Sequence, residues 1–242
     1  LPLSTLHLIE HLRNGSADRR ERLAEVFEHF SQNCFMAPWT TILPIEIHHA
    51  IIQTFVPEQT APVPQIFGRG FTFGLDSRIL RDLKLNLFTE YIDELNLLVT
   101  QPGALSELLA FSNEPNRVWQ KELIAELNDR DVSAAEELRT VRKPYTKTLH
   151  RRAQYARYTH MFQGQLRNTL RSVGRTLDDF VALGVDGLTE FWSRVPSLDV
   201  DCELTLYRDR QWSRSVEGND FCDIGYLVLA VPYCDIVAVE KF

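Results

Sequence analysis

The sequence is poor in cysteine and has no long hydrophobic run. Its 242 residues include four cysteines, Cys34, Cys202, Cys222 and Cys234, and no two of them form a CxxC pair. This spacing argues against a disulfide framework or a zinc knuckle and favours a reducing compartment. No apolar stretch approaches the roughly 20 residues that a membrane-spanning helix needs, and no signal-peptide pattern opens the chain. We therefore expect a cytoplasmic protein with no membrane partner.

Acidic residues are absent from one long segment. Between Leu138 and Leu177 lie ten of the 26 Lys and Arg residues and none of the 33 Asp and Glu residues, although the whole chain has a net charge of −7. Charge segregated in this way indicates a polyanionic partner or an acidic neighbouring subunit. A homo-oligomer or a complex with another protein therefore stays open beside nucleic acid.

The same segment predicts a basic helix over 145–175. Apolar and aromatic residues at helical spacing give it a packing face, and most of its arginines remain outside that face. Arginine suits phosphate contacts, and tyrosine can stack on unpaired bases. We predict that nucleic acid contacts five side chains: Arg151, Arg152, Arg157, Tyr155 and Tyr158. The alternative is that these arginines pair with the protein's own acids.

The remaining periodicity divides the chain into three segments. Residues 1–75 predict the first part of an α/β domain, with helices over 18–30 and 41–55. Residues 76–195 are almost entirely of helical pattern and predict a long helical insertion, which contains the basic helix. Residues 196–242 predict the second part of the α/β domain.

The last segment has the pattern of a βαβ unit. Val200–Tyr207 alternates between apolar and polar residues as a strand does, Phe221–Val231 is an apolar helix, and Asp235–Glu240 is a short buried strand. Strand, helix and strand in this order imply a parallel sheet flanked by helices. Leu1-Pro2-Leu3 resembles the end of another strand, so we expect upstream sequence to belong to the same domain.

His7-Leu-Ile-Glu10-His11 is a literal H-x-x-E-H, the zinc-binding pattern of one class of metallopeptidases. Five residues match such a pattern by chance, and this helix is short and follows a strand. We therefore interpret His7 and His11 as partly exposed residues of an amphipathic helix, with no zinc bound.

Four carboxylates are better candidates for a site. Asp220 and Asp223 stand at a helix N-terminus, where the helix dipole favours negative charge. Glu10 lies one turn into the helix after the first strand, and Glu240 ends the last strand, so a parallel sheet would bring all four to one edge. Clustered carboxylates repel each other unless a cation such as Mg²⁺ or Mn²⁺ neutralises them. The alternative is that Asp220 only caps its helix and Asp223 is solvated.

Three stretches together resemble the PIN-like nucleases. Ser4–Glu10 after a strand is similar to their second-acid segment, Asn219–Asp223 to their third, and Asp235–Phe242 to their last strand with its acid. The resemblance covers about 1–50 and 196–242. It implies a PIN-like fold whose metal ligands are Glu10, Asp220, Asp223 and Glu240, with Asp223 and Glu10 catalytic, and whose first acid lies upstream of Leu1.

The resemblance implies a metal-dependent phosphodiesterase, an endoribonuclease that uses Mg²⁺ or Mn²⁺ and acts on RNA rather than DNA. It also implies a role in a toxin or defence system. The alternative is a non-catalytic subunit that binds nucleic acid or assembles a larger complex. Of the two hypotheses, the sequence favours the enzyme over the non-catalytic subunit.

Overall fold

The computed structural model describes residues 2–4, 7, 16–74, 101, 103, 129 and 131–237. The chain divides into two compact units: one comprises Leu1–Ile42 and Gln65–Leu127, the other Leu43–Pro64 and Asn128–Phe242. Within the described ranges, no helix is long and apolar enough to cross a membrane.

The first unit contains a two-stranded antiparallel sheet. Strand β1 (Cys34–Met36) pairs with β2 (Phe67–Arg69). Helix α2 (Ala17–Ser31) precedes β1, and its Ser16 cap accepts a hydrogen bond from the Arg19 N–H at 3.3 Å. This helix confirms the one predicted over 18–30. The fully buried Phe35 ring sits so close to the 3₁₀ turn η1 (Phe71–Gly74) that a Cβ on Gly74 would lie 2.7 Å from it.

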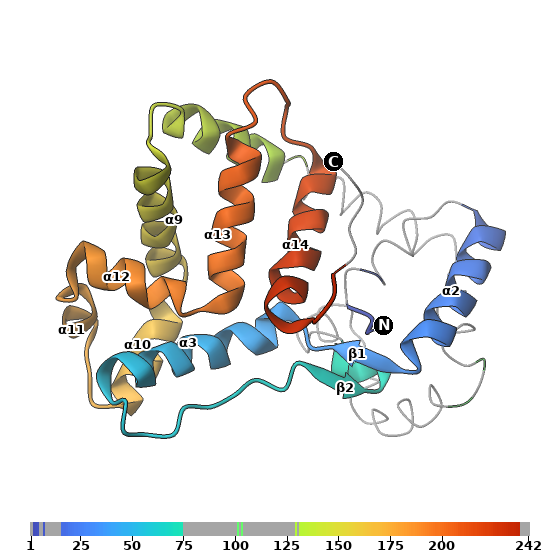
Figure 1. Cartoon of the computed structure of the whole chain (residues 1–242), viewed down its shortest axis with the longest axis horizontal. Helices are drawn as coiled ribbons and strands as arrows, with labels where there is room; N and C mark the ends of the chain where they lie inside the picture. The colour runs from blue at the N-terminus through green and yellow to red at the C-terminus, as the bar shows by residue number, and fades with distance from the viewer. Residues whose placement is uncertain are drawn as a thin grey trace. The chain divides into compact units, whose positions relative to one another are not determined.

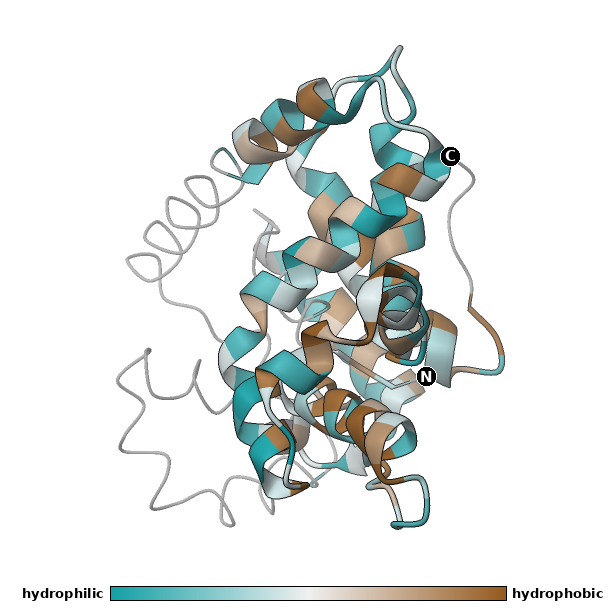
Figure 2. Cartoon of the chain, turned by 90° about the vertical axis from the view of Figure 1, so that its left-hand side faces the viewer, coloured by the Kyte–Doolittle hydropathy of each residue, from teal (hydrophilic) through white to brown (hydrophobic). Residues whose placement is uncertain are grey.

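The second unit is helical throughout its described part. It holds most of α3 (Trp39–Phe55), a helix over 131–142, α9 (Lys147–Met161), α10 (Gln163–Ser172), α11 (Leu177–Val181), α12 (Gly184–Ser193), α13 (Pro196–Asp209) and α14 (Gly218–Tyr233). Helix α13 packs against α9 on one side and α14 on the other (Figure 1). Figure 2 shows teal and brown residues mixed along these helices, as amphipathic helices require.

The core of this unit combines a cluster of aromatic rings with fully buried aliphatic side chains. Trp192, Phe180 and Phe191 are fully buried and meet edge to face, with ring centroids 4.8 to 6.4 Å apart. Ile47 and Ile51 of α3 and Leu198 and Leu206 of α13 are also fully buried. From residue 131 onward, the described residues of the predicted segments 76–195 and 196–242 belong to the same compact unit.

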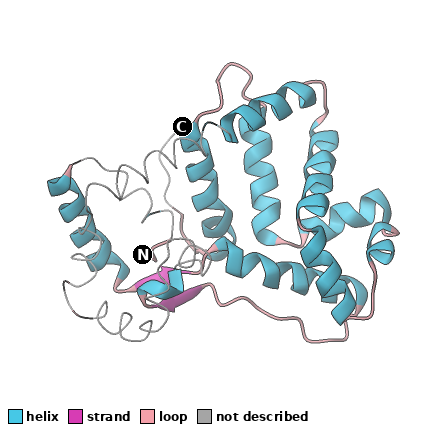
Figure 3. Ribbon diagram, turned by 180° about the vertical axis from the view of Figure 1, so that it is seen from behind, coloured by secondary structure: helices cyan, strands magenta, loops and turns pink. Residues whose placement is uncertain are grey.

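The predicted parallel α/β sheet is wrong. The structure is mostly helical, and the strands of its described residues form only the antiparallel pair β1–β2 (Figure 3). Val200–Tyr207, predicted as a strand, lies inside α13. The alternation misled because Asp201, one of the polar residues, is half-buried and accepts a hydrogen bond from Tyr158 of α9. The buried positions Leu198, Cys202 and Leu206 follow the helical period of four.

Of two further predictions for the C-terminal half of the chain, one is wrong and one is confirmed. The basic helix over 145–175 is two helices, α9 and α10, separated at Phe162. The apolar helix predicted over 221–231 is confirmed as α14. Residues 235–237 of the predicted last strand are not strand, and 238–242 lie outside the described residues.

Candidate nucleic-acid interface and acidic site

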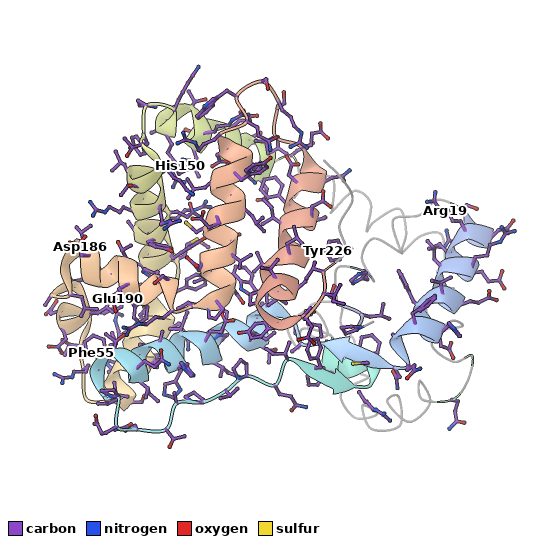
Figure 4. The ribbon with its side chains drawn as sticks, in the orientation of Figure 1. Arg19, Phe55, His150, Asp186, Glu190 and Tyr226 are labelled. Carbon is purple, nitrogen blue, oxygen red and sulfur yellow. The ribbon has the colours of Figure 1, made fainter. Side chains whose placement is uncertain are left out.

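The charges of α9 are largely neutralised within the second unit. Arg151 forms a close ion pair with Glu203 of α13, and Lys147 Nζ lies 3.2 Å from the same carboxylate. Partial burial would raise the pKa of Glu203, but these two hydrogen bonds outweigh it, so the pKa falls below its usual value. Arg152 reaches the exposed Asp186 of α12 at 2.9 Å (Figure 4).

Tyr155 and Tyr158 belong to the core. Each side chain is 2% exposed, and Tyr158 packs its ring 5.8 Å from the Trp192 ring. The Tyr155 hydroxyl donates to Asp199 at 2.6 Å, and the Tyr158 hydroxyl donates to Asp201. Burial, together with these acids, raises the pKa of both phenols. Rings enclosed in this way are not available to stack on bases, which corrects the role predicted for them.

A buried polar cluster lies beside these pairs. His150 Nε2 is 3.5 Å from Asp209 Oδ2, and Arg142 Nη1 donates to Gln154 Oε1 at 2.9 Å. Burial, and then the Arg142 charge, lower the pKa of His150, so this imidazole is neutral near pH 7. His150 stands on the stretch of α9 that faces α13 (Figure 4). None of the sequence patterns predicts this cluster.

One arginine fixes the loop that leads into α14. Arg139 is 5% exposed and donates to the carbonyl oxygens of Asp209 at 3.1 Å, of Arg214 at 2.7 Å, and of Gln211. Its guanidinium also lies 5.2 Å from the centre of the Trp212 ring. The start of α14 is therefore positioned by side chains from another helix.

The start of α14 holds both of the predicted acids that the structure describes. Asp220 is 6% exposed; it accepts from the Glu217 N–H at 2.9 Å and from Arg214 at 2.6 Å. The Asp220 hydrogen bond, and then the charges of Asp220, Glu217 and Asp223, raise the pKa of Arg214. Asp220 thus caps its helix, as one of the two sequence interpretations holds, and Asp223 is half-buried one turn further on.

Glu10, Glu240 and His11 lie outside the described residues. His7 is described: the Ser4 backbone N–H donates to its Nδ1 at 3.1 Å, and the Ser4 hydroxyl lies 2.8 Å from the same nitrogen. Among the described residues, no group of three His, Cys, Asp or Glu side chains is arranged to hold a metal ion.

The remaining arginines face solvent. Arg157 is exposed, and its charge acts on the half-buried Asp201. Arg167 and Arg171 are exposed on one side of α10, four residues apart. In the described part of the chain, no carboxylate forms a salt bridge with either of these two arginines.

No protein-family model matches the chain, and no curated protein or solved structure is similar to it.

Proposed function

We propose that this protein is a phosphodiesterase that uses Mg²⁺ or Mn²⁺ to cleave RNA. The observation that carries the proposal is the group of carboxylates around Arg214 at the start of α14, where Asp220 and Asp223 occupy the first two turns. Helix α14 begins at Gly218, and Asp220 lies in its first turn. The prediction of a parallel sheet is wrong, and this observation does not depend on it.

The chemistry follows from the charge at this place. Glu217, Asp220 and Asp223 put three negative charges near one guanidinium and at the positive end of a helix dipole. A divalent ion held by Asp223 together with further carboxylates would supply an activated water and would stabilise the leaving oxygen of a phosphodiester. Asp223 lies half-buried one turn after Asp220, and we propose it as a metal ligand. Glu240 is proposed as a further ligand.

The cysteines agree with a site of action in the cytoplasm, which we also propose. All four are in the described residues, and none of them forms a disulfide. Free thiols are usual in a reducing compartment.

Replacing Asp223 by asparagine tests the proposal. The change removes one carboxylate and keeps the size of the side chain, so cleavage of a labelled RNA in Mg²⁺ or Mn²⁺ should fall by about 100-fold or more, since a metal ligand is lost. RNA binding should persist. The matched control is Asp178→Asn, because Asp178 is likewise an acid close to the start of a helix, α11. Metal-dependent cleavage by Asp223→Asn at the wild-type rate would contradict the proposal.

A second candidate is a non-catalytic subunit that binds nucleic acid or assembles a complex. It is favoured by the two exposed arginines of α10 that have no acidic partner within the described residues. The same assay separates the two candidates: a wild-type protein that binds RNA but never cleaves it, in Mg²⁺ or in Mn²⁺, is a binding subunit.

A further inference from the structure

Helix α10 presents an exposed face that the second unit does not use for its own packing. The buried residues of α10 are Leu166, Thr169 and Leu170. The opposite side, which we call the α10 face, consists of Gly164, Arg167, Asn168 and Arg171, all exposed. No acid lies within α10 itself, so the charge of this face is uniformly positive.

Several arginines close to the α10 face in sequence already have partners within the second unit. Arg151 and Arg152 of α9 are paired with Glu203 and Asp186. The guanidinium of Arg175, just past α10, lies 5.8 Å from the centre of the Phe55 ring. Arg167 and Arg171 remain, about 6 Å apart along the helix axis at 1.5 Å per residue.

Gly164 leaves the first turn of α10 without a side chain. It is the second residue of the helix, where the cost of glycine found in helix interiors does not apply in full. A Cβ on Gly164 would meet nothing within 4 Å, and its φ is not positive, so neither packing nor backbone conformation requires glycine there. A surface without a side chain next to two arginines allows the backbone of a ligand to approach closely.

We propose that the α10 face binds the sugar-phosphate backbone of single-stranded RNA. Guanidinium groups donate to phosphate oxygens in a fork, and the Asn168 amide can donate to phosphate or sugar. Bases are not read here, because the aromatic side chains of α9 nearby are buried. The inference rests on the proposed function for its ligand, and it moves the contact from the residues predicted on α9 to α10.

The test is the binding of a labelled 20-nucleotide single-stranded RNA to the full chain in EDTA, where metal-dependent cleavage is suppressed. Arg167→Glu/Arg171→Glu should weaken binding on the order of 10-fold or more and lower the salt slope by about 1.4, at roughly 0.7 per lost phosphate contact. The control is Arg19→Glu/Arg22→Glu, which reverses two exposed charges of α2 and changes the net charge equally. The control should bind nearly as wild type.

A second variant separates contact from folding. Gly164→Ala should leave the melting temperature unchanged or raise it, and still weaken RNA binding several-fold, because the methyl group blocks close approach. Wild-type affinity in both α10 variants would overturn the inference, as would equal losses in the α10 and α2 double variants.

Sedimentation of the same proteins tests whether the α10 face binds the acidic surface of a second copy of the chain in place of RNA. If Arg167→Glu/Arg171→Glu dissociates a wild-type oligomer and leaves RNA affinity intact, the occupant is that second copy and the inference fails. Because binding is measured in EDTA, this failure is distinct from a failure of Asp223→Asn to abolish cleavage.

Discussion

Replacing Glu46 by alanine should destabilise the helical unit by about 3 kcal/mol or more. The side chain is 2% exposed, and its carboxylate accepts from the Ser197 N–H at 3.3 Å, from the Ser197 hydroxyl at 2.7 Å and from the Tyr233 hydroxyl. A buried donor left without an acceptor costs roughly 1–3 kcal/mol, and three donors are affected. Water that enters the space left by the carboxylate replaces part of these hydrogen bonds, so we expect the total cost to lie near the lower end of the range, at about 3 kcal/mol.

The structural reason is that Glu46 of α3 caps α13. The N-cap residue of α13, Val195, has no side chain that can accept a hydrogen bond, and Ser197 lies in the first turn. Glu46 supplies the acceptor from another helix, and through Tyr233 it also ties down the end of α14. One carboxylate therefore joins three helices.

Glu46→Gln adds a dependence on pH whose sign is fixed. Burial raises the pKa of Glu46 above its usual 4.5, against the hydrogen bonds from Tyr233 and Ser197, which lower it. The folded state then binds this proton more tightly than the unfolded state. The contribution to stability is complete below the unfolded pKa and is lost as pH rises through the folded pKa. The difference in stability between wild type and Glu46→Gln should therefore be largest near pH 4 and shrink toward pH 7.

Hydrogen exchange of α13 amides in urea, at several pH values, measures both effects. The matched control is Glu137→Ala, an exposed glutamate in the helix over 131–142. The reasoning is refuted if Glu46→Ala costs no more than this control, or if the penalty of Glu46→Gln grows as pH rises.

Two other changes test the interior of the same unit. Tyr158→Phe should cost about 1–3 kcal/mol in urea unfolding, because it leaves the half-buried Asp201 carboxylate without its donor. RNA affinity should stay unchanged; a loss of affinity at full stability would restore the base-stacking role. Arg139→Met should release the loop around Trp212, seen as faster proteolysis there and a shifted tryptophan emission, since three carbonyl oxygens lose their donor. Unchanged proteolysis would show that Arg139 does not hold the loop.

The helices that the sequence predicted well are those with clear ends. Ser16 before an apolar-periodic run marks the start of α2, and the polar residues before Phe221 mark the start of α14. Helix α13 lacks such a signal. Its start at Pro196 is capped by Glu46, 151 residues away from Ser197 in sequence, so no local pattern announces it. The only local hint is one glutamate within an otherwise apolar run of α3.

The candidate site was predictable only in part for the same reason. A run without acids was evident, but the acids that neutralise it stand 34 to 52 residues downstream on α12 and α13. Local sequence shows how much charge a helix carries and not how much of it remains unpaired. Arg167 and Arg171 differ from Arg151 and Arg152 only through those distant partners.

The polar interface between α9 and α13 also fixes how the two helices are aligned. Following α9 forward, Arg151 meets Glu203 and Tyr155 meets Asp199, so the contacts run backward along α13, as in an antiparallel pair. A slip of one turn, about 5.4 Å, would move Asp199 away from Tyr155 and leave a carboxylate without its donor. Leucine contacts alone would tolerate such a slip far better, because apolar attraction has no direction. The hydroxyl and guanidinium donors of α9 therefore set the register of α13, and with it the loop and the acids that begin α14.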